Sequence, residues 1–202
     1  MGNYYKRMLE RIQADERYSK NIDYAVGPPG RQWTLRGHVA ELECSLATLQ
    51  DLADCNQQDK IRLLIHVHDL FLPEVPKLPG ADLNSHGVRA AVLLIEQGAE
   101  PDIIRMCQWH EEPFGLWKQM KATSRRNAEV QHRLEKLAEE ISDWETFLLF
   151  HVIDTVNNDQ LAWFLHAIWR RVPDEARALG FVAWDQLRMA QRYERSRNGR
   201  HT

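Results

Sequence analysis

The feature that most constrains the fold is a short apolar run that ends in a histidine and an aspartate. Residues 63–69 read Leu-Leu-Ile-His-Val-His-Asp. A helix of this composition must bury most of its surface, yet imidazole and carboxylate groups are costly to bury without partners. A divalent metal ion is the strongest such partner, because it binds imidazole nitrogen and carboxylate oxygen together. A fold containing this segment must therefore bring further ligands to His68 and Asp69.

Apolar residues recur at helical spacing along most of the chain, and almost no segment shows the alternation of a strand. We expect one compact all-α domain over residues 1–202, with its core at about 34–171. The predicted helices span residues 4–14, 34–54, 60–71, 85–98, 101–110, 116–126, 128–141, 144–171 and 174 onward. The helix at 144–171 is predicted to be the longest.

Proline, glycine and capping residues divide these helices. Prolines and glycines at 24–32 and 73–83 predict loops, the second of them passing over the site. Thr34 and Asp143 precede apolar stripes as candidate N-caps, and Gly98 follows one as a candidate C-cap.

Composition places the chain among ordinary globular proteins. Of its 202 residues, 44% are hydrophobic and 27% are charged, so it can bury a core unaided. The net charge of −3 gives no overall basic field that would indicate nucleic acid. The three cysteines, Cys44, Cys55 and Cys107, show no paired spacing, and the N-terminus is not signal-like, so we expect a cytoplasmic protein. No apolar run reaches about 20 residues, so we expect no membrane segment.

Polar residues lie on the apolar stripes of five predicted helices. Residues three, four or seven apart share a helix face, so His68 lies with Leu64 and Ile65 and not with Lys60, which we expect to face solvent. The other polar residues of this kind are His38, His86, His110 and Asp154. One buried histidine is more simply explained by a hydrogen bond to a backbone carbonyl. Five such groups together indicate a shared metal site.

The types of ligand residue indicate which metals could bind, and the absent motifs exclude several enzyme classes. Imidazole with carboxylate suits Mn, Fe, Co, Ni or Zn better than Ca or Mg, and no cysteine-rich cluster predicts a structural zinc. The chain lacks the GxxxxGK[ST], GxSxG and HExxH motifs of other enzyme classes. Cys107 falls on an apolar stripe, whereas a nucleophilic cysteine needs an exposed, electropositive setting.

The ordered set His38, His68-Asp69 and Asp154 resembles the H…HD…D signature of the HD-domain metal-dependent phosphohydrolases. The resemblance covers about residues 34–160 and implies a compact HD-domain helical bundle. It implies two divalent ions bridged by Asp69, which together supply a metal-bound hydroxide for phosphate ester cleavage. The implied metal ligands are His38, His68, Asp69, His86, His110 and Asp154.

Segments 38–43, 68–71 and 110–114 are also similar to HD modules of bacterial RNA end-healing systems. Those modules act on RNA 2′,3′-cyclic phosphate or 2′-phosphate ends beside a polynucleotide kinase. The similarity implies a phosphorylated nucleotide or RNA end as substrate and an RNA-repair protein as partner. Such modules tend to carry a lysine three residues after the aspartate, where this chain has Leu72. Either Lys77 or Lys118 replaces that lysine, or the substrate differs, or catalysis is lost.

Two classes of function therefore remain open. The intact ligand set favours a metal-dependent phosphatase or phosphodiesterase, whereas Leu72 favours a non-catalytic HD-fold module that senses a nucleotide or docks a partner. In the enzyme, Asp69 and Lys118 would act on the substrate. Glu41, one turn from His38, would orient an imidazole, although a solvated helix face explains it equally well. For the arginines at 188–200, a solvated helix end is favoured over contact with nucleic acid.

Overall fold

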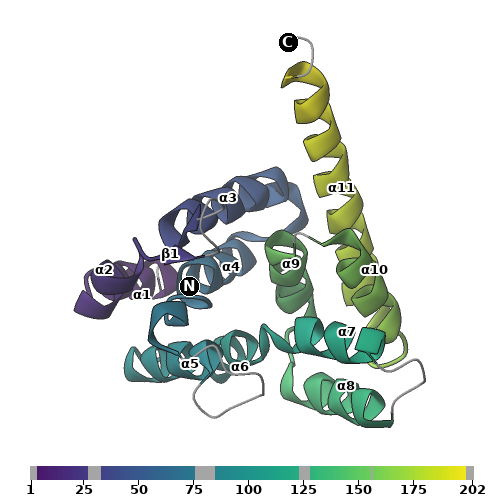
Figure 1. Cartoon of the computed structure of the whole chain (residues 1–202), viewed down its shortest axis with the longest axis horizontal. Helices are drawn as coiled ribbons and strands as arrows, with labels where there is room; N and C mark the ends of the chain where they lie inside the picture. Colours follow the sequence, from purple (N-terminus) through teal and green to yellow (C-terminus); the bar gives the residue numbers. More distant parts are fainter. Residues whose placement is uncertain (1–3, 27–32, 76–84, 123–127, 156, 199–202) are drawn as a thin grey trace.

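The computed structural model describes residues 4–26, 33–75, 85–122, 128–155 and 157–198, with the side chains of 194–198 left out. The all-α prediction is confirmed: the described residues are mostly helical (Figure 1). The helices are α1 (Tyr4–Gln13), α2 (Glu16–Asn21), α3 (Leu35–Thr48), α4 (Cys55–Val67), α5 (His86–Glu96), α6 (Pro101–Trp109), α7 (Glu112–Ala122), α8 (Ala128–Glu140), α9 (Trp144–Asp154), α10 (Asn158–Ala167) and α11 (Asp174–Asn198). Short 3-10 turns follow α3 (Gln50–Leu52) and α4 (Leu72–Glu74).

Helix α4 lies at the centre of the fold. It packs against α1, α3, α6 and α9, and these neighbours cover it on most sides (Figure 1). Five of its apolar residues are no more than 1% exposed: Ile61, Leu63, Leu64, Ile65 and Val67. The continuous apolar run in the sequence is thus explained by a helix enclosed by other helices.

Helix α9 is the second buried element and ends earlier than predicted. Nearly all its side chains are buried, but the helix at 144–171 is divided after Asp154. Thr155 is extended, and Asn157 accepts hydrogen bonds from the backbone of Asp159 and Gln160, which starts α10. The prediction of one helix was wrong because apolar spacing continues across this break. The longest described helix is instead α11.

The predicted caps are confirmed. The Thr34 side chain accepts from the Gly37 N–H, Asp143 accepts from the Thr146 N–H, and Gly98 follows α5 with φ of 74°. Helix α4 begins at Cys55, before the predicted start, because Asp54 and Gln57 form a capping box.

Two further expectations were wrong at the N-terminal side. Residues 24–32 were predicted as a loop, but β1 (Ala25–Val26) pairs antiparallel with β2 (Trp33–Thr34). Strands of two residues are too short to show alternation. The short helix α2 was also missed; its N-cap, Asp15, accepts from the Arg17 N–H. The predicted loop at 73–83 lies largely outside the described residues.

Lys60 does not face solvent. Its residue is 9% exposed, and its Nζ lies 2.8 Å from Asp143 Oδ2, at the start of α9. The lysine stem covers apolar surface while its charge is paired, which an exposed-face assignment from spacing misses. Across the described ranges, no helix is both long and apolar enough to cross a bilayer.

Candidate metal centre

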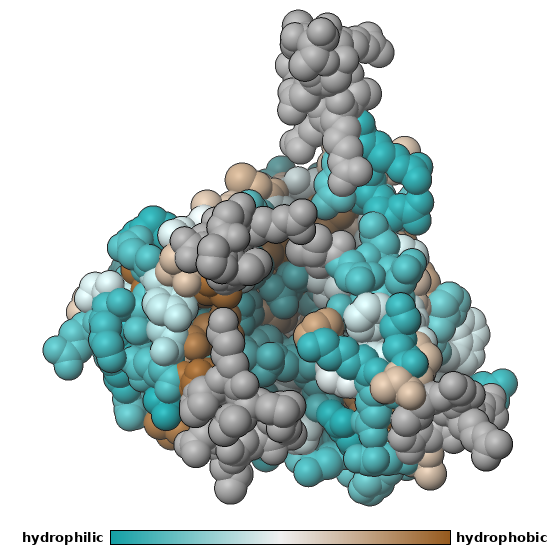
Figure 2. Space-filling model, viewed as in Figure 1, coloured by the Kyte–Doolittle hydropathy of each residue, from teal (hydrophilic) through white to brown (hydrophobic). Residues whose placement is uncertain are grey.

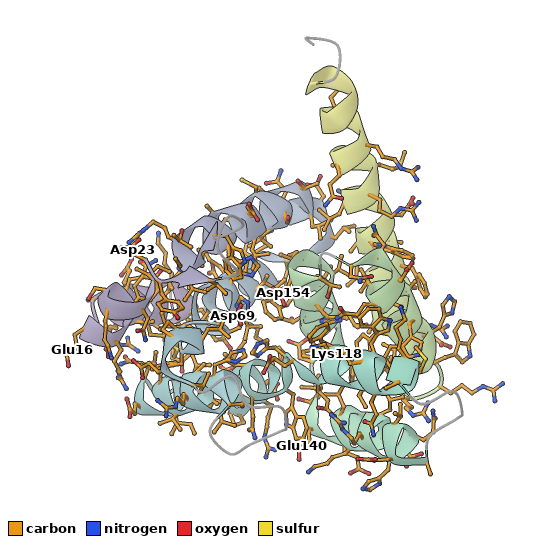
Figure 3. The ribbon with its side chains drawn as sticks, in the orientation of Figure 1. Glu16, Asp23, Asp69, Lys118, Glu140 and Asp154 are labelled. Carbon is orange, nitrogen blue, oxygen red and sulfur yellow. The ribbon has the colours of Figure 1, made fainter. Side chains whose placement is uncertain are left out.

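The six predicted ligands meet at helix ends. His38 lies in the first turn of α3 and His86 opens α5, whereas His68 and His110 follow the last residues of α4 and α6. Asp154 is the last residue of α9. Asp69 and Asp154 lie in the middle of the molecule (Figure 3). The surface is hollowed there when it is seen from the same side (Figure 2). Helix ends therefore bring side chains from distant parts of the sequence to one point.

Asp69 lies in the turn after α4 and divides its two oxygens between two groups of histidines. Its Oδ1 lies 3.1 Å from His86 Nε2 and 3.5 Å from His110 Nε2. Its Oδ2 lies 3.4 Å from His68 Nε2 and 4.0 Å from His38 Nε2. Each oxygen of Asp69 thus belongs to a different group of residues that could hold a metal ion.

Asp154 completes the group around His38 and His68. Its Oδ1 lies 3.3 Å from His38 Nε2 and 3.4 Å from His68 Nε2. One group of possible ligands is His38, His68 and Asp69, and the other is Asp69, His86 and His110. Within each group, the ligand atoms lie within 4.8 Å of one another. Neighbouring ligands of one ion with bonds of about 2.1 Å stand about 3.0–3.4 Å apart. Most of the separations around Asp69 and Asp154 are close to this range, and the 4.0 Å between His38 Nε2 and Asp69 Oδ2 is wider.

The outer ring nitrogens determine what the inner nitrogens can do. His68 Nδ1 lies 3.0 Å from the Leu64 carbonyl oxygen, and His110 Nδ1 lies 2.7 Å from that of Cys107. A carbonyl only accepts, so Nδ1 carries the hydrogen and Nε2 of the neutral ring presents a lone pair. His86 Nδ1 lies 3.5 Å from Glu111 Oε2. Contacts of this kind orient histidine ligands in metal sites.

Several inward lone pairs lack a hydrogen-bond donor. His86 Nε2 and His110 Nε2 stand 3.1 Å apart. If both neutral rings carry their hydrogen on Nδ1, two lone pairs face each other; only a hydrogen on His86 Nε2 would let the rings hydrogen-bond. His68 is 1% exposed, and its Nε2 has no hydrogen-bond partner among the described residues. A positive charge between these atoms, either a proton or a metal ion, would relieve both conditions.

The pKa shifts of His68 and Asp154 also favour a positive charge at this site. Burial lowers the pKa of His68, but the charges of Asp69 and Asp154 outweigh it and raise that pKa well above the ordinary value. For Asp154, burial raises the pKa, but the charge of His68 and the nearby ring nitrogens of His38 and His68 bring it well below the ordinary value. The carboxylates are therefore held ionised, as metal ligands must be.

Gly87 allows the two histidines of the second group to meet. A Cβ at this position would lie 3.1 Å from the Cys107 carbonyl oxygen, 3.2 Å from that of Gln108 and 3.3 Å from His110 Cε1. Such contacts are tighter than almost all real Cβ contacts. The missing side chain thus lets the start of α5 approach the end of α6.

The phosphate-binding candidates lie apart from this cluster. Lys118 is exposed on α7, with its Nζ 3.9 Å from the centroid of the Phe114 ring (Figure 3). Leu72 is half-buried and packs against the core, so it occupies an apolar position. Arg89 on α5, a further cation that could bind phosphate, pairs instead with Glu74 at 3.2 Å. Lys77 lies outside the described residues.

The carboxylate that contacts a predicted ligand is not Glu41, which stays a prediction as an orienting residue. Glu41 is exposed, whereas Glu111 contacts His86. Sequence spacing within one helix cannot reveal Glu111, because its contact runs from the turn before α7 to α5. Cys107 is fully buried, and burial first and the charge of Asp69 second raise the pKa of its thiol. This supports its rejection as a nucleophile.

Comparisons with protein-family models, curated proteins and solved structures give no significant match to this chain.

Proposed function

We propose that this protein is a metal-dependent phosphohydrolase of the HD-domain type that acts on a phosphate ester of a nucleotide or RNA end. The observation that carries the proposal is the division of the Asp69 oxygens between two histidine groups. A single structural ion would need only one of these groups, whereas paired ions bridged by a carboxylate are typical of enzymes that cleave phosphate esters.

Each ligand has a defined place in the proposed centre. One divalent ion would be held by His38, His68, Asp154 and Asp69 Oδ2, and a second by His86, His110 and Asp69 Oδ1. The donor set favours Mn, Fe, Co, Ni or Zn. When bound, such ions activate water and neutralise charge on phosphate oxygens.

The protein's own residues prepare this chemistry. The Leu64 and Cys107 carbonyls hold His68 and His110 with Nε2 inward. Glu111 Oε2 lies 3.5 Å from His86 Nδ1 and would favour the same orientation of His86. Burial of the histidine rings keeps bulk water away from the inner face of the cluster. The side chains of Asp69 and Asp154 are each about 20% exposed, and a phosphate can approach them from this partly exposed side.

A second candidate function is a non-catalytic module that binds metal and senses a nucleotide or docks a protein. It is favoured by Leu72, which is packed against the core where a phosphate-binding lysine was expected. The exposed Lys118, whose ammonium group contacts Phe114, gives no contrary support.

The two candidates are separated by Asp69→Ala, with Asp51→Ala as the matched control on an exposed aspartate. With Mn²⁺, Co²⁺ or Ni²⁺ present, we expect wild type and Asp51→Ala to hydrolyse a generic phosphomonoester or phosphodiester. Loss of an ion removes several kcal/mol of stabilisation, so Asp69→Ala should be slower by about 10³-fold or more. Equal turnover in Asp69→Ala and wild type would contradict the mechanism.

Metal content gives an independent readout. Elemental mass spectrometry of protein purified with added metal should find two ions per chain in wild type and fewer in Asp69→Ala. Bound metal without turnover on any phosphate ester would favour the non-catalytic module. Among substrates, oligonucleotides ending in 2′-phosphate, 2′,3′-cyclic phosphate or 3′-phosphate should be compared with free nucleotides, to test the RNA-end assignment.

A further inference from the structure

A second potential binding site lies between α10 and α11, away from the metal ligands. It is an open pocket of about 430 Å³, and its lining includes Asn158 and Asp159 from α10 and Trp184, Arg188 and Arg192 from α11. These two helices lie side by side in Figure 1. The pocket combines cationic, aromatic and amide groups in one place.

The two arginines of the pocket differ from most others in the chain. Arg36, for example, pairs with Asp23 at 2.7 Å, and Arg133 pairs with Glu112 at 2.7 Å. Within the part of the chain that the structure describes, neither Arg188 nor Arg192 has a carboxylate within 4.0 Å. Two guanidinium groups one helical turn apart, opposed by the single carboxylate of Asp159, leave a local positive charge in a chain whose net charge is −3.

Trp184 holds the pocket in shape. Its Nε1 donates a hydrogen bond to Asn158 Oδ1 at 2.8 Å, which ties α11 to the start of α10. Its half-buried ring packs against the core, and the Arg188 guanidinium lies 5.2 Å from the ring centroid. A planar cation beside an aromatic ring is a platform on which nucleic-acid bases stack, and arginine forks match phosphate oxygens.

The position of the pocket connects it to the metal centre. Asp154 ends α9 and Asn158 begins α10, so their Cα atoms are at most about 14 Å apart. A strand with its terminal phosphate at the metal centre could therefore extend to the pocket within a few nucleotides.

We infer that this pocket binds the backbone and a base of a single-stranded nucleic acid whose end lies at the metal centre. The inference rests on the proposed function and specifies its substrate as a polynucleotide end, not a free nucleotide. The arginines bind backbone phosphate, and Trp184 with Arg188 supports a base.

Binding is tested without metal, so that the result does not depend on hydrolysis. Fluorescence anisotropy in EDTA would compare the Kd of a labelled single-stranded RNA for wild type, Arg188→Gln/Arg192→Gln and Lys6→Gln/Arg7→Gln. The last variant removes two exposed charges from α1, on the far side of the molecule (Figure 1). We expect the Kd to rise at least tenfold for the pocket variant and less than twofold for the control.

Salt dependence and competition give two further readouts. Each lost phosphate contact should lower the slope of log Kd against log salt by about 0.7 for a single strand, so the pocket variant should lose about 1.4. Equal Kd values and slopes in the pocket and control variants would overturn the inference. Displacement of the RNA by polyglutamate as readily as by unlabelled RNA would also overturn it, because the pocket would then be a general anion site.

Turnover separates this inference from the proposed function. With metal, Arg188→Gln/Arg192→Gln should raise KM for an oligonucleotide end but leave turnover of a generic phosphomonoester unchanged. If no phosphate ester is hydrolysed, the proposed function fails, while the anisotropy result still decides whether the pocket binds RNA.

Discussion

The two ends of α4 each hold buried charged groups, but only one end supplies its own counter-charge. Near the start, the Lys60 ammonium pairs with Asp143, whose carboxylate also accepts from the Thr146 N–H and hydroxyl. Near the end, imidazole nitrogens are the only cationic partners within 4.0 Å of Asp69 and Asp154 among the residues that the structure describes. If the imidazoles are neutral, this second cluster carries an uncompensated charge of −2.

The difference indicates which buried cluster is structural and which awaits a ligand. Buried ions persist only when paired or bound to metal. The Lys60–Asp143 pair meets this condition within the chain and also caps α9. The His68–Asp69 cluster meets it only with protons or added cations, so an external ion should stabilise this end of α4 and have no effect at the other.

The largest expected effect on stability is at the self-sufficient end. Lys60→Met should lower the free energy of unfolding by about 3 kcal/mol, because it leaves the Asp143 carboxylate buried without its cation. Urea unfolding with EDTA and with saturating Mn²⁺ would measure this loss. The stabilisation by Mn²⁺ should be the same in Lys60→Met and wild type.

A second variant tests whether the lost pair is the cause. Lys60→Met/Asp143→Asn removes the unpaired charge and keeps an N-cap of equal quality, so it should recover most of the loss. Failure to recover would show that packing of the lysine stem, and not charge, stabilises this end.

A buried histidine outside the cluster gives an expected effect of similar size. His151 is 2% exposed between Phe147 and Phe164, and burial lowers its pKa from 6.5 to about 4. The unfolded chain therefore binds the proton more readily. Stability should be lost as pH falls from about 6.5 towards 4, by about 3 kcal/mol from this group.

Substitution can isolate that contribution. Urea unfolding of His151→Leu in EDTA between pH 7.5 and 4.5 should show a shallower loss of stability on acidification than wild type. His132→Leu, at an exposed position, should keep the wild-type slope. Parallel curves for His151→Leu and wild type would contradict a buried, neutral His151.

The sequence predicted the fold class and the polar residues that lie on inward faces of their helices, because both follow from local spacing. His68 could be placed on a buried face of α4 from the apolar residues around it, and the same held for His38 and Asp154. Predictions from spacing were wrong at two places. Asn157 starts a new helix within an apolar stretch, and Lys60 is buried because it pairs with an aspartate far away in the sequence.

The contacts between the residues of the site were harder to predict than which residues belong to it. The division of the Asp69 oxygens depends on the turn after α4, and the meeting of His86 and His110 depends on the absent side chain of Gly87. Both are contacts between elements far apart in sequence. The contact between Glu111 and His86 was not predicted for the same reason, since only the fold brings the turn before α7 to α5.

The smallest expected effect distinguishes Glu111 from Glu41. Glu111→Gln removes the carboxylate near His86 Nδ1, and such substitutions cost 10- to 100-fold in metal affinity. Because the Glu111 side chain is 52% exposed, we expect a loss of about tenfold in the affinity for one of two Mn²⁺ ions. Glu41→Gln is the matched control on an exposed glutamate and should leave both affinities unchanged.

Isothermal titration of Mn²⁺ into the metal-free variants would measure the affinity for each of the two ions. If Glu41→Gln weakened binding and Glu111→Gln did not, the orienting carboxylate would belong to the His38 group, and the contact between Glu111 and His86 would have no role in metal binding.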